Sequence, residues 1–295
     1  MSSNELLQKV DNYKHFEDLT AHARAEAGLK NINCFLSPDQ IDSFARQRVL
    51  SYFRDDMSLI LFHDHDAYFQ LYLFLDAADP QFRIDRLDKD AVTDFPGMNR
   101  TLNTKYQRAI EELRKAGFAH NATSVKMIKE LIEPTEIDLS PAGGLQLQVA
   151  EPRHMHKIYE LWGSGLDAAS NALPSIADLE RHIEEGSIVI GVVDDALVGA
   201  IQVESKIDGS CFLRHLVVSD AYKGRSVGST LMRQAPYYSI EPVPRSAYHW
   251  VQTTNVPALA MFEKIGYGFD GRYLEQYILK AYEGDQLLHK HQQNA

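Results

Sequence analysis

The 295-residue chain has little of several features that would define its class at once. It has only two cysteines, Cys34 and Cys211, and they lack the spacing of a zinc site or a redox pair, so a reducing cytoplasm is the expected location. Its apolar stretch from Ser58 to Leu75 is interrupted by His63-Asp-His-Asp66, which argues against a membrane-spanning helix. The first residues, Met1-Ser-Ser-Asn-Glu5, lack the basic and apolar pattern of a secretion signal.

Basic charge is also scarce. Thirty lysines and arginines stand against 41 acidic residues, the formal net charge is −11, and no basic run occurs. A protein that binds nucleic acid needs a positive face, so we expect neither a nucleic-acid partner nor a membrane partner. The histidine pairs at 63 and 65, 154 and 156, and 289 and 291 lie in predicted turns or tails. We therefore expect solvated loops there and no metal site.

The length of the chain favours two domains. At 44% hydrophobic and 24% charged residues, the composition is that of a globular protein with a sizeable core. The segment from Pro134 to Gly144 is rich in proline, glycine and serine and is the expected linker. The predicted organisation is an α/β domain over 1–139, a second α/β domain over 145–282 and a polar tail over 283–295.

A basic, glycine-containing loop lies at the centre of the second domain. An apolar stretch, Leu213 to Val218, predicts a buried strand, and Val227 with Leu231 predicts one face of a helix. Between them lies Lys223-Gly-Arg-Ser-Val-Gly-Ser229. Glycines, two cations and a helix N-terminus suit a diphosphate, because backbone N–H groups and the helix dipole attract negative charge. An ordinary strand-to-helix turn that needs two glycines is the alternative.

A second motif follows downstream. A predicted strand ends near Gln252, Asn255-Val-Pro257-Ala258 opens a short helix, and Gly266-Tyr267 closes it. Together the two motifs resemble the GNAT superfamily of acyl-CoA-dependent N-acetyltransferases, whose loop pattern is [Gln/Arg]-x-x-Gly-x-[Gly/Ala]. Lys223 takes the Gln/Arg place, Ser226 takes the glycine place and Gly228 fits, and the resemblance covers about Leu145 to Leu279. Because Ser226 has a Cβ, we expect a backbone conformation there that tolerates one.

The resemblance implies a mixed, largely antiparallel sheet flanked by helices, with acetyl-CoA or another acyl-CoA as cofactor. It also implies N-acyl transfer to a primary amine of a small molecule. The implied cofactor contacts are backbone groups of one strand, the amides of the loop and two residues of the second motif. These residues are Leu216, Val217, Val218, Lys223, Gly224, Arg225, Ser226, Val227, Gly228, Ser229, Asn255 and Phe262.

The proton chemistry has three candidate bases, and a base that acts through a relaying water is the alternative. His215 lies on the central strand, Glu204 on the preceding hairpin strand and His249 on the strand that precedes Asn255. Many family members have a tyrosine as general acid seven residues after the asparagine, and here that position is Phe262. A non-catalytic or regulatory acetyl-CoA binder is therefore the alternative, favoured by Phe262 and Ser226.

The first half of the chain echoes the second. Ser58-Leu-Ile-Leu-Phe-His-Asp64 matches Ser187-Ile-Val-Ile-Gly-Val-Val193, and Gly117-Phe118 matches Gly266-Tyr267 at a helix end. The interval between these matches is shorter in the first half, where no counterpart of the 223–229 loop occurs. This pattern predicts a degenerate GNAT-like N-terminal domain without a cofactor site. Two unrelated α/β layers with similar local patterns are the alternative.

Overall fold

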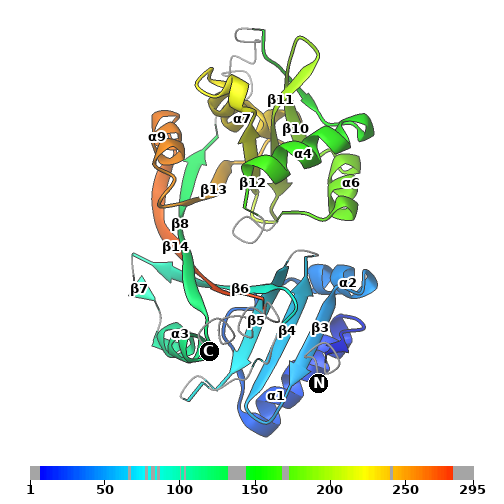
Figure 1. Cartoon of the computed structure of the whole chain (residues 1–295), viewed down its shortest axis with the longest axis vertical. Coiled ribbons are helices and arrows are strands. Elements are labelled where there is room, and N and C mark those ends of the chain that lie inside the picture. Colours follow the sequence, from blue (N-terminus) through cyan, green and yellow to red (C-terminus); the bar gives the residue numbers. More distant parts are fainter. Residues whose placement is uncertain are drawn as a thin grey trace, which may run out of the picture. The chain divides into compact units, whose positions relative to one another are not determined.

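The computed structural model describes residues 7–65, 68–76, 79–80, 84, 87–99, 101–102, 104–131, 144–167, 173–239 and 242–281. Most of the predicted linker and the whole predicted tail over 283–295 lie outside these residues. The chain divides into two compact units (Figure 1): Met1–Asn121 with Leu274–Ala295, and Ala122–Tyr273. We call these the N-terminal unit and the C-terminal unit.

The C-terminal unit is built on a mixed sheet in the order β9-β10-β11-β12-β13-β8. Neighbouring strands are antiparallel except β12 and β13, which are parallel. The strands are β9 (Gln146–Val149), β10 (Ile188–Val193), β11 (Ala196–Ser205), β12 (Ser210–Val218), β13 (Ser246–Gln252) and β8 (Ala119–Glu130). The helices are η3 (Pro152–His154), α4 (Met155–Gly165), α6 (Ile176–Glu184), η4 (Asp220–Tyr222), α7 (Val227–Gln234), α8 (Pro236–Ser239) and α9 (Val256–Lys264).

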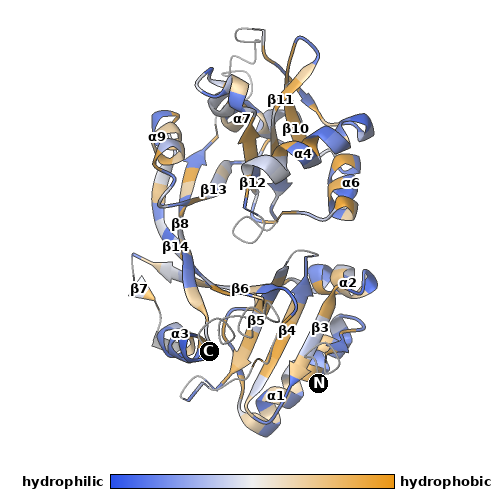
Figure 2. Ribbon diagram, viewed as in Figure 1, coloured by the Kyte–Doolittle hydropathy of each residue, from blue (hydrophilic) through white to orange (hydrophobic). Residues whose placement is uncertain are grey.

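Two hydrophobic cores join these helices to the sheet. One contains Ile158 and Trp162 of α4, Leu179 and Ile183 of α6, and Val217 of β12. The other contains Val227 and Leu231 of α7, Phe262 of α9, and residues of β11, β12 and β13. Apolar residues spaced three or four apart form one face of a helix, which is why α4 and α6 each contribute a single buried stripe. Figure 2 shows hydrophobic residues concentrated on the strands of this unit, with polar residues on the outer turns of the helices.

The N-terminal unit has the same strand order, β1-β3-β4-β5-β6-β14, with a parallel pair again formed by the fourth and fifth strands. Its strands are β1 (Gln8–Lys9), β3 (Leu50–Arg54), β4 (Ser58–Asp64), β5 (Tyr68–Leu75), β6 (Asp90–Met98) and the end of β14 (Gly268–Leu279). Two short strands, β2 (Lys30–Asn31) and β7 (Thr101–Leu102), pair with β5 and β6. The helices are α1 (Tyr13–Ala27), α2 (Pro38–Arg46) and α3 (Thr104–Lys115).

The repeated strand order agrees with the predicted tandem arrangement, but it corrects the alignment of the two halves. The sequence match paired β4 with β10, whereas the sheet order makes β11 the counterpart of β4. The match was wrong because a run of apolar residues that ends near an aspartate is common to many hairpin strands. The match between the ends of α3 and α9 agrees with the order of the elements.

Each unit takes its last strand from a long strand that begins in the other unit. The compact units are divided within β8, after Asn121, and within β14, after Tyr273. The domain bounds predicted from sequence, 1–139 and 145–282, instead keep β8 whole in the first domain and β14 whole in the second.

Candidate active site

Strands β12 and β13 form a fork. Their parallel pairing covers only three residue pairs, from Ser210 with Ser246 to Phe212 with Tyr248. Beyond them β12 runs to Val218 and β13 to Gln252 without pairing with each other, although all of these residues are described. Neighbouring residues of a strand direct their N–H and C=O groups to opposite edges. Because the Ser219 N–H bonds to a carbonyl of β11, the backbone groups of Leu216 and Val218 face the fork.

A bulge in β12 lies where the fork opens. The pairing of β11 with β12 shifts register between Ala200 and Gln202, and His215 has a φ of 51°. This left-handed conformation is uncommon for residues other than glycine, and bulges of this kind often lie beside functional sites. The side chain of His215 is nearly buried, and its ring packs on Trp162 at 5.0 Å between centroids.

His249 bridges the two arms of the fork. Its Nδ1 contacts the carbonyl oxygen of Leu213, and its ring packs on Phe262 at 5.0 Å between centroids. Desolvation lowers the pKa of His249 to about 4, so the ring is neutral at pH 7. A neutral ring that faces a carbonyl must donate through Nδ1–H. This placement favours a role in holding the strands over proton abstraction.

The 223–229 loop presents free backbone amides. The N–H groups of Lys223 and Arg225 bond to Asp220 and Tyr222 carbonyls at 3.3 Å. No hydrogen bond to another described residue engages five other amides of the loop, those of Gly224, Ser226, Val227, Gly228 and Ser229. Three of these amides belong to the first turn of α7, which has no side-chain cap.

The loop adopts a conformation that glycine would favour. Ser226 precedes α7 with a φ of 64°, so the expectation that its backbone would suit a Cβ is wrong. Such a conformation costs a residue with a side chain roughly 1–2 kcal/mol. The exposed side chain of Lys223 pairs with Asp220 at 2.6 Å, and the Arg225 guanidinium lies 5.2 Å from the Tyr222 ring centre. An uncapped helix N-terminus with two adjacent cations is an anion-binding arrangement.

The residues of the second motif have clear local roles. The Asn255 side-chain oxygen accepts the Ala258 N–H at 3.2 Å and so caps α9. Phe262, at the place of the family's tyrosine, is 1% exposed and packs between His249 and Tyr267. No hydroxyl is present at this position, and the ring belongs to the core.

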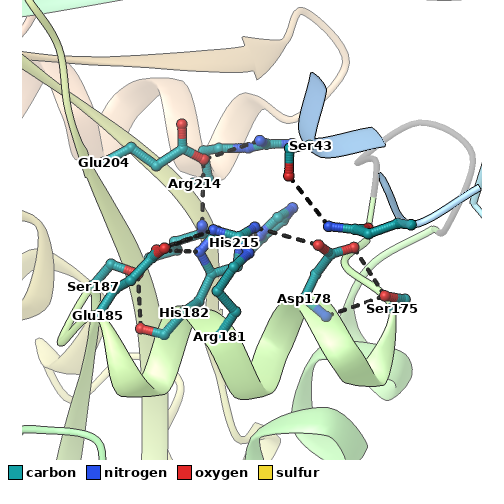
Figure 3. A network of polar contacts seen from close by, with 12 residues as sticks. Ser43, Ser175, Asp178, Arg181, His182, Glu185, Ser187, Glu204, Arg214 and His215 are labelled. Atoms are coloured by element: carbon teal, nitrogen blue, oxygen red, sulfur yellow. Dashed lines mark hydrogen bonds and ion pairs between the residues drawn. The ribbon is translucent and has the colours of Figure 1, made fainter. Parts of the chain in front are cut away.

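Glu204 is held as a carboxylate. Its Oε1 accepts a hydrogen bond from Arg214 at 3.0 Å (Figure 3), and its Oε2 accepts one from Lys206 at 2.8 Å. Desolvation alone would raise its pKa, but Arg214 and Lys206 outweigh it and lower the pKa to about 2. A group with this pKa and two occupied oxygens is a poor base at neutral pH.

The N-terminal unit has an equivalent fork, and its own chain fills it. Parallel pairing of β5 with β6 also covers three residue pairs, after which β2 pairs with the end of β5. The Asn33 side chain then spans the gap: its oxygen accepts the Leu73 N–H at 2.7 Å, and its nitrogen donates to Thr93 Oγ1 at 2.7 Å and to the Asp94 carbonyl. The backbone groups of β5 that would face a ligand are therefore occupied by residues 30–33.

Within the described ranges, no three histidine, cysteine, aspartate or glutamate side chains gather in a way that could hold a metal ion. Among the helices that the structure describes, none combines the length and the apolar character needed to cross a membrane.

Comparison with known proteins agrees with this geometry. Residues 155–267 match the Acetyltransferase (GNAT) family. A streptothricin acetyltransferase of Escherichia coli is 30% identical over 95 residues, which are 32% of this chain and 55% of that protein. The chain thus spans about half the length of this curated relative.

Solved structures extend the likeness to nearly the whole chain. A tandem GNAT protein from the clavulanic acid biosynthesis pathway aligns with a TM-score of 0.60 at 13% identity, covering 95% of this chain and 99% of that one. A GCN5-related N-acetyltransferase from Sphaerobacter thermophilus aligns with a TM-score of 0.55 at 12% identity, covering 93% and 95%. At this identity the two structures show the fold alone. Residues 155–267 are therefore similar to the Acetyltransferase (GNAT) family, within a chain that has the fold of tandem GNAT proteins.

Proposed function

We propose that the C-terminal unit binds acetyl-CoA and transfers its acetyl group, or a short acyl group, to a primary amine of a small molecule. The observation that carries this proposal is the set of five unengaged amides in the 223–229 loop, which directly follows the open fork. A diphosphate on the loop and an extended chain in the fork would use backbone groups that have no hydrogen-bond partner among the described residues.

Residues of the chain have distinct parts in this scheme. Amides of the loop, with Lys223 and Arg225, bind the diphosphate, and the backbone of Leu216 and Val218 orients the acyl arm. The backbone of Val217, which was also predicted to contact the cofactor, faces β11 instead. Asn255 holds the start of α9 beside the fork, and Phe262 supports the same wall through its packing on His249. Acetyl-CoA supplies an acetyl group activated as a thioester.

Of the three candidate bases, His215 fits proton removal best. Glu204 is fixed as an ion-paired carboxylate, and His249 uses its Nδ1 proton to bridge the fork. His215 lies in the bulge of β12, beside the backbone groups that would orient the acyl arm. Because residue 262 has no hydroxyl, the thiolate leaves without a general acid from that position.

One relative supports a small-molecule acceptor. The name of the Escherichia coli relative makes streptothricin the first amine to test. The net charge of −11 supports the expectation that no nucleic acid is bound, and the two cysteines support a cytoplasmic location.

Two measurements test the proposal. Acetyl-CoA should raise the melting temperature, because a ligand that binds only the folded state stabilises it. Release of CoA thiol should then follow addition of streptothricin or of another amine from a panel of primary amines. No thermal shift at saturating acetyl-CoA would end the proposal, whereas a shift without thiol release would favour the non-catalytic binder that Phe262 already suggests.

The filled N-terminal fork adds a stoichiometric expectation. Residues 30–33 cover the edge of β5 that β6 leaves unpaired, so the described part of the N-terminal unit has no open fork. We therefore expect one acetyl-CoA per chain. Calorimetry that gives two equivalent sites would contradict this assignment.

A further inference from the structure

We propose that Gln202 and Glu204 act as positioning residues that fix the tautomer of His215, with the proton on Nδ1 and the lone pair on Nε2. This inference rests on the proposed function, since it names how the base of that reaction is prepared. It depends on a chain of three side chains on β11 and β12, of which Glu204 and His215 are labelled in Figure 3.

The chain begins at an anchored carboxylate. Glu204 Oε1 accepts from Arg214, and Oε2 accepts from Lys206, so this side chain cannot turn without breaking an ion pair. An ionised carboxylate can only accept hydrogen bonds. Whatever amide group approaches Glu204 must therefore present its NH₂ end.

The side-chain amide of Gln202 lies between Glu204 and His215. Its side-chain nitrogen lies 3.3 Å from Glu204 Oε1, and its side-chain oxygen lies 2.9 Å from His215 Nδ1. The residue is 1% exposed, so its amide has no solvent to satisfy a flipped orientation. Because the NH₂ end faces the carboxylate, the oxygen end faces the histidine.

His215 then has a defined protonation pattern. An amide oxygen at Nδ1 requires a proton there, which leaves Nε2 of the neutral ring as the proton acceptor. The bulge conformation and the packing on Trp162 hold the ring in place. This arrangement follows the logic of a base oriented by a second group, which in turn is fixed by a carboxylate.

The proton balance of the step is simple. As the amine nitrogen bonds to the acetyl carbon, the C–S bond breaks and its electron pair leaves with the thiolate. The N–H bond of the attacking nitrogen breaks, and the proton moves to His215 Nε2. The resulting imidazolium faces Gln202, whose dipole is oriented by Glu204, and it later returns the proton to water.

The tautomer can be measured without any substrate. In protein labelled with ¹⁵N-histidine, long-range ¹H–¹⁵N spectra distinguish protonated from bare ring nitrogens, and His215→Asn assigns the signals of residue 215. At alkaline pH, where the ring is neutral, we expect a protonated Nδ1 and a bare Nε2. A protonated Nε2 with a bare Nδ1 in the wild-type protein would overturn the inference.

A matched pair of variants tests the positioning. Gln202→Met removes both hydrogen bonds at nearly constant volume, and Gln148→Met makes the same change on β9, far along the sheet from His215. For Gln202→Met we expect both tautomers of residue 215. We also expect kcat for acetylation of streptothricin, or of the first amine accepted, to fall about tenfold, while KM for acetyl-CoA stays within about twofold. Gln148→Met should leave both quantities unchanged.

The outcomes separate the two proposals. If acetyl-CoA binds and an amine is acetylated, but Gln202→Met keeps the wild-type tautomer and kcat, the positioning role is wrong and the proposed function survives. If no amine of the panel is acetylated by the wild-type chain, the proposed function fails and the inference fails with it.

Discussion

Ser229 offers a perturbation that affects ligand binding and folding in opposite directions. It is the third residue of α7, and its hydroxyl donates to the Ser226 carbonyl at 2.9 Å. Replacement by aspartate places a negative charge in the first helical turn. In the free protein this charge interacts favourably with the helix dipole, by about 0.3–1 kcal/mol, so the melting temperature should stay constant or rise.

The same charge should repel a bound diphosphate. Taking two negative charges about 6 Å from the new carboxylate and an effective dielectric constant of about 40, Coulomb's law gives a penalty of about 2.8 kcal/mol. This penalty corresponds to about a hundredfold increase in Kd for acetyl-CoA. Asparagine has nearly the same shape without the charge, so Ser229→Asn should change Kd by less than about threefold if charge dominates.

Isothermal titration calorimetry of the two variants with acetyl-CoA measures this difference. Added salt should narrow the gap between them, because ions screen partly exposed charges. Equal affinities of Ser229→Asp and Ser229→Asn, in folded proteins, would show that the diphosphate does not lie on these amides.

Three further predictions concern packing and pH. A Cβ on Gly165 would lie 2.5 Å from Cγ1 of Val217, so Gly165→Ala should lower the free energy of unfolding by about 1–3 kcal/mol. Gly163 lies on the same helix with open space around a Cβ, so Gly163→Ala should raise the free energy of unfolding by up to about 1 kcal/mol. If urea denaturation shows that both variants change this free energy in the same direction, the packing of Gly165 on Val217 is contradicted. Burial raises the pKa of Asp94 from 3.8 to about 6, so the folded state keeps this proton to a higher pH than the unfolded state does. The free energy of unfolding should therefore fall by up to about 3 kcal/mol as the pH rises between these two values. Asp94→Asn should therefore stabilise the protein above pH 6 and have little effect below pH 3.8, and a gain confined to low pH would refute this sign. Phe262→Tyr should lower the free energy of unfolding by about 1–3 kcal/mol, because the new hydroxyl would enter a site that is 1% exposed. A variant that is as stable as the wild type and has a higher kcat would instead show that a tyrosine at this position can act as a general acid.

Local features of the fold were predictable from sequence because they depend on neighbouring residues. Asn255 with Pro257 begins α9 as the sequence indicated, and Ser37 and Ser175 cap α2 and α6 through local side-chain hydrogen bonds. The 223–229 loop also lies between a strand and a helix as predicted. Its left-handed Ser226 was not foreseen, since the conformation is imposed by the loop and not by the preference of serine.

Features that depend on distant pairings were not predictable. The division of β8 and β14 between the two units, and the use of residues 30–33 to fill the N-terminal fork, require knowledge of which strands meet. The same holds for the Glu204–Gln202–His215 chain, because alternation along each strand does not reveal that a bulge brings the His215 side chain within hydrogen-bond distance of Gln202. A polar residue inside an apolar strand, as Gln202 is, was the one signal that could have pointed to it.

Amide NMR measures whether backbone amides of the 223–229 loop bind the diphosphate of acetyl-CoA. In ¹⁵N-labelled protein, acetyl-CoA should shift the signals of Gly224, Ser226, Val227, Gly228 and Ser229 strongly, whereas pantetheine, which has no diphosphate, should leave them nearly unchanged. Binding of acetyl-CoA that leaves these five signals in place would contradict the account.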